Sequence, residues 1–198
     1  GYGLETLLRM GGGGLLVGSS SATIGRAIVT NTVFHNNLAN GTNGGGAVML
    51  RDSSTTFTNC TFYGNDHYGN LVGATSASGY GDVLYMRGQS AQDRAFMANC
   101  ILSNNGSLPA RGDLSITYSY SEIRIANSLF HSTVQSVFAG SNSSAVIVDL
   151  GGNISKESLL GGNSSVGVNP RFVDPANGDF ALMAGSPAID NGASVALT

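Results

Sequence analysis

Charged side chains are scarce in this sequence, and lysine is almost absent. Asp, Glu, Lys and Arg together make up 11% of the 198 residues, whereas soluble domains usually contain roughly 25%. Lys156 is the one lysine, the formal net charge is −3, and basic residues form no run. A chain with so few cations is poorly suited to neutralising a row of phosphates, so the composition argues against nucleic acid as a partner.

Long apolar runs are absent as well. No apolar stretch approaches the roughly 20 residues that a helix needs to cross a bilayer, so the sequence predicts no membrane span. Glycine, with 29 residues, takes the place of the missing charges together with Ser and Asn. Because Gly and Asn tolerate the left-handed backbone of tight corners, this composition favours short strands joined by many turns. The length suits one domain.

An eight-residue motif recurs four times between residues 30 and 133. Its second position is always asparagine, and these asparagines are 28, 40 and 28 residues apart: Asn31, Asn59, Asn99 and Asn127. Three positions later each copy has a large apolar residue: Phe34, Phe62, Leu102 and Phe130. A period of this length is typical of solenoids, in which each repeat forms one coil.

The repeat therefore predicts an all-β parallel β-helix of about five coils over residues 1–165, followed by a C-terminal capping segment over 166–198. Residues 1–14 form a candidate N-terminal cap, either an amphipathic helical turn or a further strand. The longer interval between Asn59 and Asn99 fits a loop insertion at residues 69–81. Insertions of this kind in solenoids often lie on the binding face.

Coils that stack about 4.8 Å apart place equivalent residues above one another. We expect the Phe34 column to fill the core. The Asn31 column is expected to form a ladder of side-chain amides at a corner, where Asn tolerates a strained φ. Cys60 and Cys100 also share a column, and they form either a disulfide or two buried thiols. Parallel Cβ vectors favour the thiols.

The sequence contains no clear acid–base or nucleophilic constellation. A polysaccharide lyase on this fold needs clustered carboxylates and an Arg or Lys base, and the nearest candidates are Arg51, Arg87 and Asp82. Arg51 and Arg87 follow equivalent strands, so they would stack on one face. The neighbouring column is not acidic, because Asp52 has Gly88 as its equivalent. Solvated charges at turns explain these residues better, and no catalytic residue is predicted.

Metal ligands are equally sparse. His35 and His131 occupy equivalent positions but are two coils apart, so they cannot share an ion. Asp174, Asn177 and Asp179 offer oxygens for a structural calcium ion. Asx turns explain the same three residues without a metal, and this interpretation is favoured. The sequence therefore predicts no metal and no cofactor.

Two parts of the sequence resemble known repeat proteins. Residues 28–65 resemble the FxxN and GGA repeats of chlamydial polymorphic outer-membrane proteins through Phe34-His35-Asn36-Asn37, Phe62-Tyr63-Gly64-Asn65 and Gly45-Gly46-Ala47-Val48. Residues 169–192 resemble the closing segment of secreted bacterial right-handed parallel β-helix proteins, NPxFVDPxNGDF followed by GSPAIDxG. The resemblance implies a right-handed β-helix that is secreted or held at a cell surface. It implies no single activity, because this fold carries lyases, hydrolases, adhesins and scaffolds.

Two functions fit these observations. The first is a non-catalytic extracellular structural or adhesive protein, whose exposed sheet ends would let it form homo-oligomers or filaments head to tail. The second is a carbohydrate-active protein, a polysaccharide lyase or a hydrolase-like enzyme, acting at the face near Arg51, Arg87 and the 69–81 insertion. The missing catalytic constellation favours the first. A polysaccharide or another surface ligand is a candidate partner in either case.

Overall fold

The computed structural model describes residues 10–18, 24–39, 43–67, 80–88, 94–106, 113–117, 121–131, 137–139, 146–155 and 169–191. Three parallel sheets of five strands each dominate these residues. The first sheet contains β2 (Leu15–Gly18), β7 (Val48–Arg51), β12 (Leu84–Arg87), β15 (Leu114–Thr117) and β18 (Val137–Ala139). The second contains β3 (Gly25–Thr30), β8 (Ser53–Thr58), β13 (Arg94–Ala98), β16 (Glu122–Ala126) and β19 (Val146–Asp149). The third contains β4 (Val33–His35), β9 (Thr61–Tyr63), β14 (Ile101–Ser103), β17 (Leu129–His131) and β20 (Ile154–Ser155).

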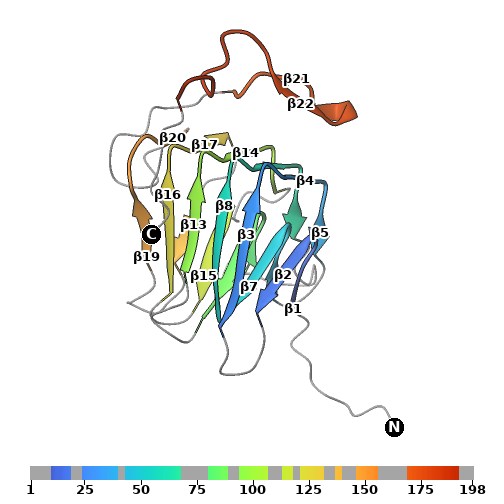
Figure 1. The fold of residues 1–198 in the computed structure, drawn as a ribbon. Helices are drawn as coiled ribbons and strands as arrows, with labels where there is room; N and C mark the ends of the chain where they lie inside the picture. The colour runs from blue at the N-terminus through green and yellow to red at the C-terminus, as the bar shows by residue number, and fades with distance from the viewer. Residues whose placement is uncertain are drawn as a thin grey trace.

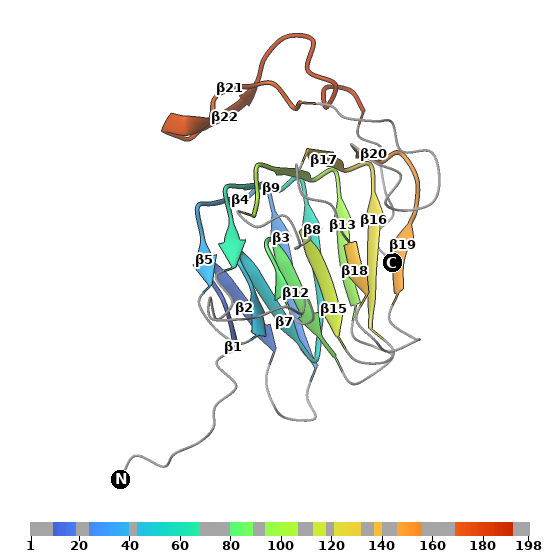
Figure 2. The same ribbon diagram turned by 180° about the vertical axis from the view of Figure 1, so that it is seen from behind.

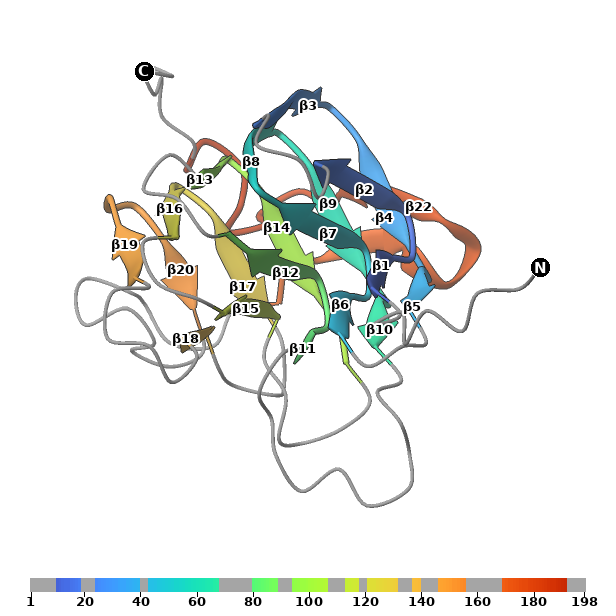
Figure 3. The same ribbon diagram turned by 90° about the horizontal axis from the view of Figure 1, so that it is seen from below.

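Each passage of the chain through the three sheets makes one coil, and the five strands of each sheet lie in chain order. The second sheet faces the viewer in Figure 1 and the first sheet in Figure 2. Figure 3 shows the coils following one another from blue to orange along the stack. The predicted parallel β-helix of five coils is therefore confirmed.

Two smaller parallel sheets complete the early coils. One joins β1 (Met10–Gly12), β6 (Asn43–Gly45) and β11 (Tyr80–Gly81), and the other joins β5 (Leu38–Ala39) and β10 (Asp66–His67). Most of the candidate N-terminal cap, residues 1–9, lies outside the described residues, and Met10–Gly12 forms a strand. The 69–81 insertion also lies outside them, except for β11 and its residues Tyr80 and Gly81.

The core consists of in-register columns of apolar side chains. Strand β8 shows the principle, because its residues alternate between buried and half-buried positions, and Phe57 is fully buried. Phe34 pairs with Phe62, and their rings stack with centroids 4.9 Å apart and 5° between planes. Leu102 and Phe130 continue this column in the next two coils. All four side chains are buried, as a column facing the common interior requires.

Left-handed backbone turns the chain at the corners. The ladder asparagines all have positive φ, from 47° to 54°: Asn31, Asn59, Asn99 and Asn127. A second corner column also has positive φ, and it contains Asn36, Gly64 and Asn104. Asn and Gly adopt this conformation at the lowest cost, which explains why they recur at these corners.

A different asparagine column carries the buried amide ladder. Asn65 is fully buried, and its Oδ1 accepts hydrogen bonds from the backbone N–H of Asn37 at 3.1 Å and from Asn37 Nδ2 at 2.9 Å. Asn105 Oδ1 in turn accepts from the Asn65 backbone N–H at 3.0 Å and from Asn65 Nδ2 at 3.1 Å. The Asn65 amide also donates to the Phe34 carbonyl at 2.9 Å. These bonds satisfy polar groups that the turn would otherwise leave buried and unpaired.

The fifth coil has one more residue at its corner than the fourth. Ile125 pairs with Asp149 and Leu129 pairs with Ile154. The chain therefore takes five steps in the fifth coil where the fourth coil takes four. Asn153 compensates, because its Oδ1 accepts from the Ser128 backbone N–H at 2.9 Å and its Nδ2 donates to the Ile125 carbonyl at 3.0 Å.

The C-terminal segment lies along the side of the stack. It contains β21 (Phe172–Asp174), the 3₁₀ turn η1 (Pro175–Asn177) and β22 (Asp179–Leu182), and the two strands form an antiparallel pair. Its Phe180 ring lies 5.1 Å from His35 and 5.2 Å from Tyr63, centroid to centroid. Figure 1 shows this red segment running above the third sheet. The aromatic residues of the predicted capping segment therefore pack on the outer face of the first two coils.

Replacing Asn65 by Ala should lower the free energy of unfolding by about 3 kcal/mol, because it leaves several buried backbone and amide groups without partners. Asn36→Gly is the matched control, since Asn36 is exposed and its φ of 53° suits glycine. We expect the control to change stability by less than about 0.5 kcal/mol. Urea denaturation followed by circular dichroism measures both, and equal midpoints would contradict the role of the Asn65 ladder.

Candidate functional site

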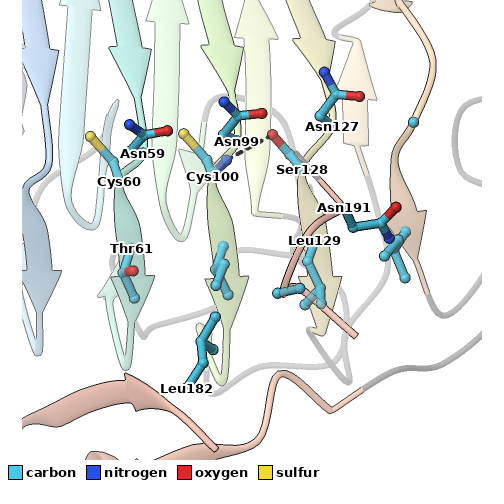
Figure 4. Close-up of a pocket in the computed structure, with 14 residues that line it drawn as sticks. Asn59, Cys60, Thr61, Asn99, Cys100, Asn127, Ser128, Leu129, Leu182 and Asn191 are labelled. Carbon is cyan, nitrogen blue, oxygen red and sulfur yellow. Dashed lines mark hydrogen bonds between the residues drawn. The ribbon is translucent and has the colours of Figure 1, made fainter. Parts of the chain in front are cut away.

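A groove runs along the corner between the second and third sheets, beneath the C-terminal segment. Its volume is ≈ 300 Å³. Figure 4 draws the 14 residues that line it. The lining comes from four successive coils and from the C-terminal segment: Asn59, Cys60, Thr61, Asn99, Cys100, Ile101, Asn127, Ser128, Leu129, Gly152, Ile154, Leu182, Ala188 and Asn191. None of these residues carries a charge.

One wall is the row of corner asparagines. Figure 4 shows the side-chain amides of Asn59, Asn99 and Asn127 side by side on neighbouring coils. Their positive φ is set by the corner, and it turns each side chain outward while the following residue faces the core. Asn59 Nδ2 donates to Asn31 Oδ1 at 3.2 Å, which links the row to the first coil. The predicted ladder asparagines thus form a row along this corner, exposed at Asn31 and Asn59 and half-buried at Asn99 and Asn127.

The floor is an outward-facing column of the third sheet. Thr61 pairs with Ile101, Ile101 with Leu129, and Leu129 with Ile154. The last two are buried, with 2% and 7% of their surface exposed, although they point away from the core. Leu182 from β22 lines the same groove. The floor is therefore apolar along three coils.

Cys60 and Cys100 lie in one column directly after the row of asparagines. Both are 1% exposed, and both are free thiols. The Cys60 sulfur lies 3.4 Å from the Thr58 carbonyl oxygen, and the Cys100 sulfur lies 3.3 Å from the Ala98 carbonyl oxygen. Ser128 takes the place of cysteine in the next coil, and its Oγ accepts from the Cys100 backbone N–H at 3.1 Å. Of the two alternatives left by the sequence, the structure has the pair of buried thiols.

The two thiols influence each other's protonation. A hydrogen bond from the Cys100 side chain lowers the pKa of Cys60 to about 7, against the opposing effect of burial. The contact with Cys60 and burial together raise the pKa of Cys100 well above its ordinary value. Cys60 is therefore the member of the pair that ionises first.

The candidate lyase residues do not converge. Arg51 and Arg87 pair in register at the ends of β7 and β12, and Arg51 Nε lies 3.8 Å from Asp52 Oδ2. Asp82 is buried just before β12 begins. Asp82 and Val83 form the bend before this strand, whose residues from Leu84 to Arg87 span about 10 Å at the rise of a strand. The structure thus places the arginines and the carboxylate at opposite ends of one strand.

The candidate calcium ligands interact with one another. Asn177 Nδ2 donates to Asp174 Oδ2 at 2.7 Å, so the amide presents its nitrogen to the carboxylate. Asp179 Oδ1 accepts from the Ala181 backbone N–H at 3.0 Å, which is an Asx turn. Within the described ranges, no three His, Cys, Asp or Glu side chains are grouped so as to hold a metal ion. Among the same residues, no helix is long and apolar enough to cross a membrane.

Sequence reasoning missed two features of this region. The first is the buried ladder of Asn37, Asn65 and Asn105, although the final Asn of the motif recurs at 28 and 40 residues and could have indicated it. The second is the groove itself, because its cover comes from Leu182, Ala188 and Asn191. No periodic signal in the sequence places that segment beside the corner asparagines.

The two thiols should react with iodoacetamide at different rates. Both side chains are 1% exposed. Only the thiolate reacts with iodoacetamide, so the pH dependence of each rate reports the ionisation of that thiol. Peptide mass spectrometry should show labelling of Cys60 that increases through pH about 7 and precedes labelling of Cys100. Because the folded pKa of Cys60 lies below its ordinary 9.0, its contribution to stability is full above pH 9.0 and is lost as the pH falls through about 7. Equal labelling rates across this range would contradict the assignment.

Comparisons with known proteins give no relative for this chain. No protein-family model matches it, and neither the curated proteins nor the solved structures contain a match. The function proposed for the chain therefore depends on the geometry of its own residues.

Proposed function

We propose that this chain is a non-catalytic structural or adhesive β-helix of the extracellular space or cell surface, and that it assembles head to tail into filaments. The resemblance of residues 169–192 to the closing segments of secreted β-helix proteins supports the location. The support for assembly comes from the two ends of the stack. The first coil ends each large sheet with β2, β3 or β4, and the fifth coil ends it with β18, β19 or β20.

The ends carry backbone groups that can extend the sheets. Gly25 N–H donates to the Asp52 carbonyl and Asn31 N–H to the Thr58 carbonyl, both at 3.0 Å. Because successive residues of a strand point their backbone groups to opposite sides, the N–H of Ile28 points away from β8. At the other end, Val146 N–H and Leu150 N–H donate back into the stack, so the groups of Ile147 point outward. A second copy can pair with these groups as one more coil.

A ring of exposed apolar side chains on the first coil carries the proposal. Each large side chain of this ring is between 49% and 79% exposed: Leu16, Ile28, Val33 and Leu38. The second coil has polar residues at the last three of these positions: Thr56, Thr61 and Asp66. Six of the nine exposed large apolar side chains among the described residues therefore lie on the first or the fifth coil, Val146 and Leu150 being on the fifth. Burial of these end coils against another copy would remove apolar surface from water.

The fifth coil offers matching side chains. The register of the second sheet places Ile28, Thr56, Phe96, Arg124 and Val148 in one column. A copy stacked in register on the fifth coil would bring its Ile28 beside Val148. In the third sheet, its Val33 would lie beside Ile154. Apolar residues meet apolar residues in both columns, as continuation of the stack requires.

Replacing Ile28 by Pro should block assembly without unfolding the protein, because it removes only an N–H that points out of the edge strand. Ile28→Thr is the matched control, since Thr occupies this column in the second coil and keeps the N–H. Sedimentation velocity and negative-stain microscopy at increasing concentration should show filaments for the wild type, shorter or fewer filaments for the control, and monomers for Ile28→Pro. Monomeric wild-type protein at high concentration, or filaments formed equally by Ile28→Pro, would overturn the proposal.

A further inference from the structure

We propose that Cys60 and Cys100 form a reversible redox pair, in which a small peroxide oxidises the two thiols to a disulfide that joins the second and third coils. Three observations carry this inference: the register of the two cysteines, the matching surroundings of their sulfurs and the groove beside them. The pair lies inside one corner of the stack, so the inference does not depend on head-to-tail assembly.

The backbone holds the two cysteines opposite each other. The Cys60 carbonyl accepts a hydrogen bond from the Ile101 backbone N–H at 2.9 Å. On the other side of the pair, the Asn59 backbone N–H donates to the Ala98 carbonyl at 3.1 Å. One coil spacing of about 4.8 Å therefore separates the Cα atoms of Cys60 and Cys100. Because disulfides join Cα atoms roughly 4.4–6.8 Å apart, the backbone need not move for the bond to form.

The two sulfurs have the same surroundings, one coil apart. Cys60 Sγ lies 3.6 Å from the Val29 carbonyl oxygen, and Cys100 Sγ lies 3.7 Å from the Phe57 carbonyl oxygen. Figure 4 shows both sulfurs pointing the same way from neighbouring coils. The two side chains already contact each other through a hydrogen bond. Rotation about χ1 toward the partner is therefore the movement that brings the sulfurs to bonding distance.

The same geometry makes the disulfide easy to reduce. Side chains stacked in register keep their Cβ atoms close to one coil spacing apart, whereas a relaxed disulfide brings them to about 3.8 Å. The disulfide is therefore strained, and strained disulfides have more oxidising potentials than relaxed ones. The thiols are the state in the structure, and the disulfide is a state that an oxidant reaches and a reductant reverses.

The unequal acidity of the thiols supports a separate role for each. The hydrogen bond from Cys100 lowers the pKa of Cys60 to about 7. The contact with Cys60, together with burial, raises the pKa of Cys100 well above its ordinary value. The thiolate is the nucleophilic form of cysteine, so Cys60 attacks the peroxide and Cys100 resolves the product.

The reaction balances with a peroxide as the oxidant. The Cys60 thiolate attacks one peroxide oxygen and the O–O bond breaks, which leaves a sulfenic acid on Cys60; the departing oxygen takes up a proton and leaves as water or an alcohol. The Cys100 sulfur then attacks the sulfenic sulfur. The S–O bond breaks, and the hydroxide leaves with the Cys100 proton as water. Two electrons have passed from the thiols to the peroxide.

The burial of the pair limits the oxidant to a small molecule. Both cysteines line the groove of ≈ 300 Å³, yet each is 1% exposed. Hydrogen peroxide is little larger than water, whereas glutathione disulfide carries two tripeptides. We therefore expect hydrogen peroxide to oxidise the pair and glutathione disulfide to react much more slowly.

The first test follows disulfide formation in the folded wild type. Hydrogen peroxide should remove the mass of two hydrogen atoms from the intact protein, and dithiothreitol should restore it. Peptide mapping should find the peptides of Cys60 and Cys100 joined within one chain, which distinguishes the reaction from methionine oxidation. The rate should increase as the pH rises through about 7, because the Cys60 thiolate is then the major form.

The second test uses two serine variants to separate the roles. Cys60→Ser and Cys100→Ser each keep one thiol, and the buried Ser128 shows that serine fits this column. Serine keeps a hydrogen-bond donor beside Cys60 in Cys100→Ser, whereas burial still holds the proton of Cys100 in Cys60→Ser. With hydrogen peroxide at pH about 7, dimedone should trap the sulfenic acid of Cys60 about tenfold or more faster than that of Cys100.

Wild-type protein that keeps both thiols in hydrogen peroxide would overturn the inference, as would disulfides formed only between copies on a non-reducing gel. Loss of the circular dichroism spectrum before loss of the thiols would have the same result, because the reaction would then need unfolding. Equal trapping in the two serine variants would remove Cys60 as the nucleophile. Glutathione disulfide reacting as fast as hydrogen peroxide would show that burial does not select a small oxidant.

Discussion

Hydrogen bonding between the backbones of successive coils is the constraint on which the rest of this structure depends. Three parallel sheets keep the same register across the described coils. Each residue therefore lies beside its own equivalent in the next coil. A column can hold Phe on Phe, Asn on Asn or Cys on Cys only because this register does not slip. A shift by one residue would exchange the core and surface faces of a strand.

The corners decide which side chains of the repeat face outward and which face the core. Positive φ at the lead asparagine turns the chain, points the asparagine outward and points the next residue into the core. The same geometry thus produces both the surface amides and the buried Cys60–Cys100 pair. Where the fifth coil departs from the register, Asn153 supplies the missing hydrogen bonds from its side chain. The stack tolerates an irregular backbone at that corner because the polar groups remain satisfied.

Stacking pairs the backbone hydrogen-bonding groups inside the β-helix but leaves two kinds of exposed surface, the ends of the stack and its side. The ends carry backbone groups aligned for a further strand, with an apolar ring on the first coil. The side carries periodic polar and apolar columns, which the C-terminal segment partly covers. The aromatic contacts of Phe180 with His35 and Tyr63 hold that segment near the first two coils. The ends and the side of the stack are therefore separate surfaces of one molecule.

The sequence by itself determined the repeat, the number of coils and the residues that share a column. It did so because an in-register stack maps each period of the sequence onto one step of the structure. The contact of Phe34 with Phe62 and the adjacency of Cys60 and Cys100 follow from that mapping. The positive φ at Asn31 and its equivalents follows from the preference of asparagine for corners.

Only the tertiary structure decided which asparagines are buried and where the C-terminal segment lies. Asn31 and Asn37 recur with the same period, so periodicity cannot separate an exposed amide from a buried one; the direction of the chain at the second corner turns Asn65 inward. The C-terminal segment has no repeat. Its position depends on aromatic contacts between residues more than a hundred positions apart in the chain. Local residue preferences and column patterns do not predict contacts between residues so far apart in the chain. The groove depends on such contacts, because the C-terminal segment that covers it is held by them.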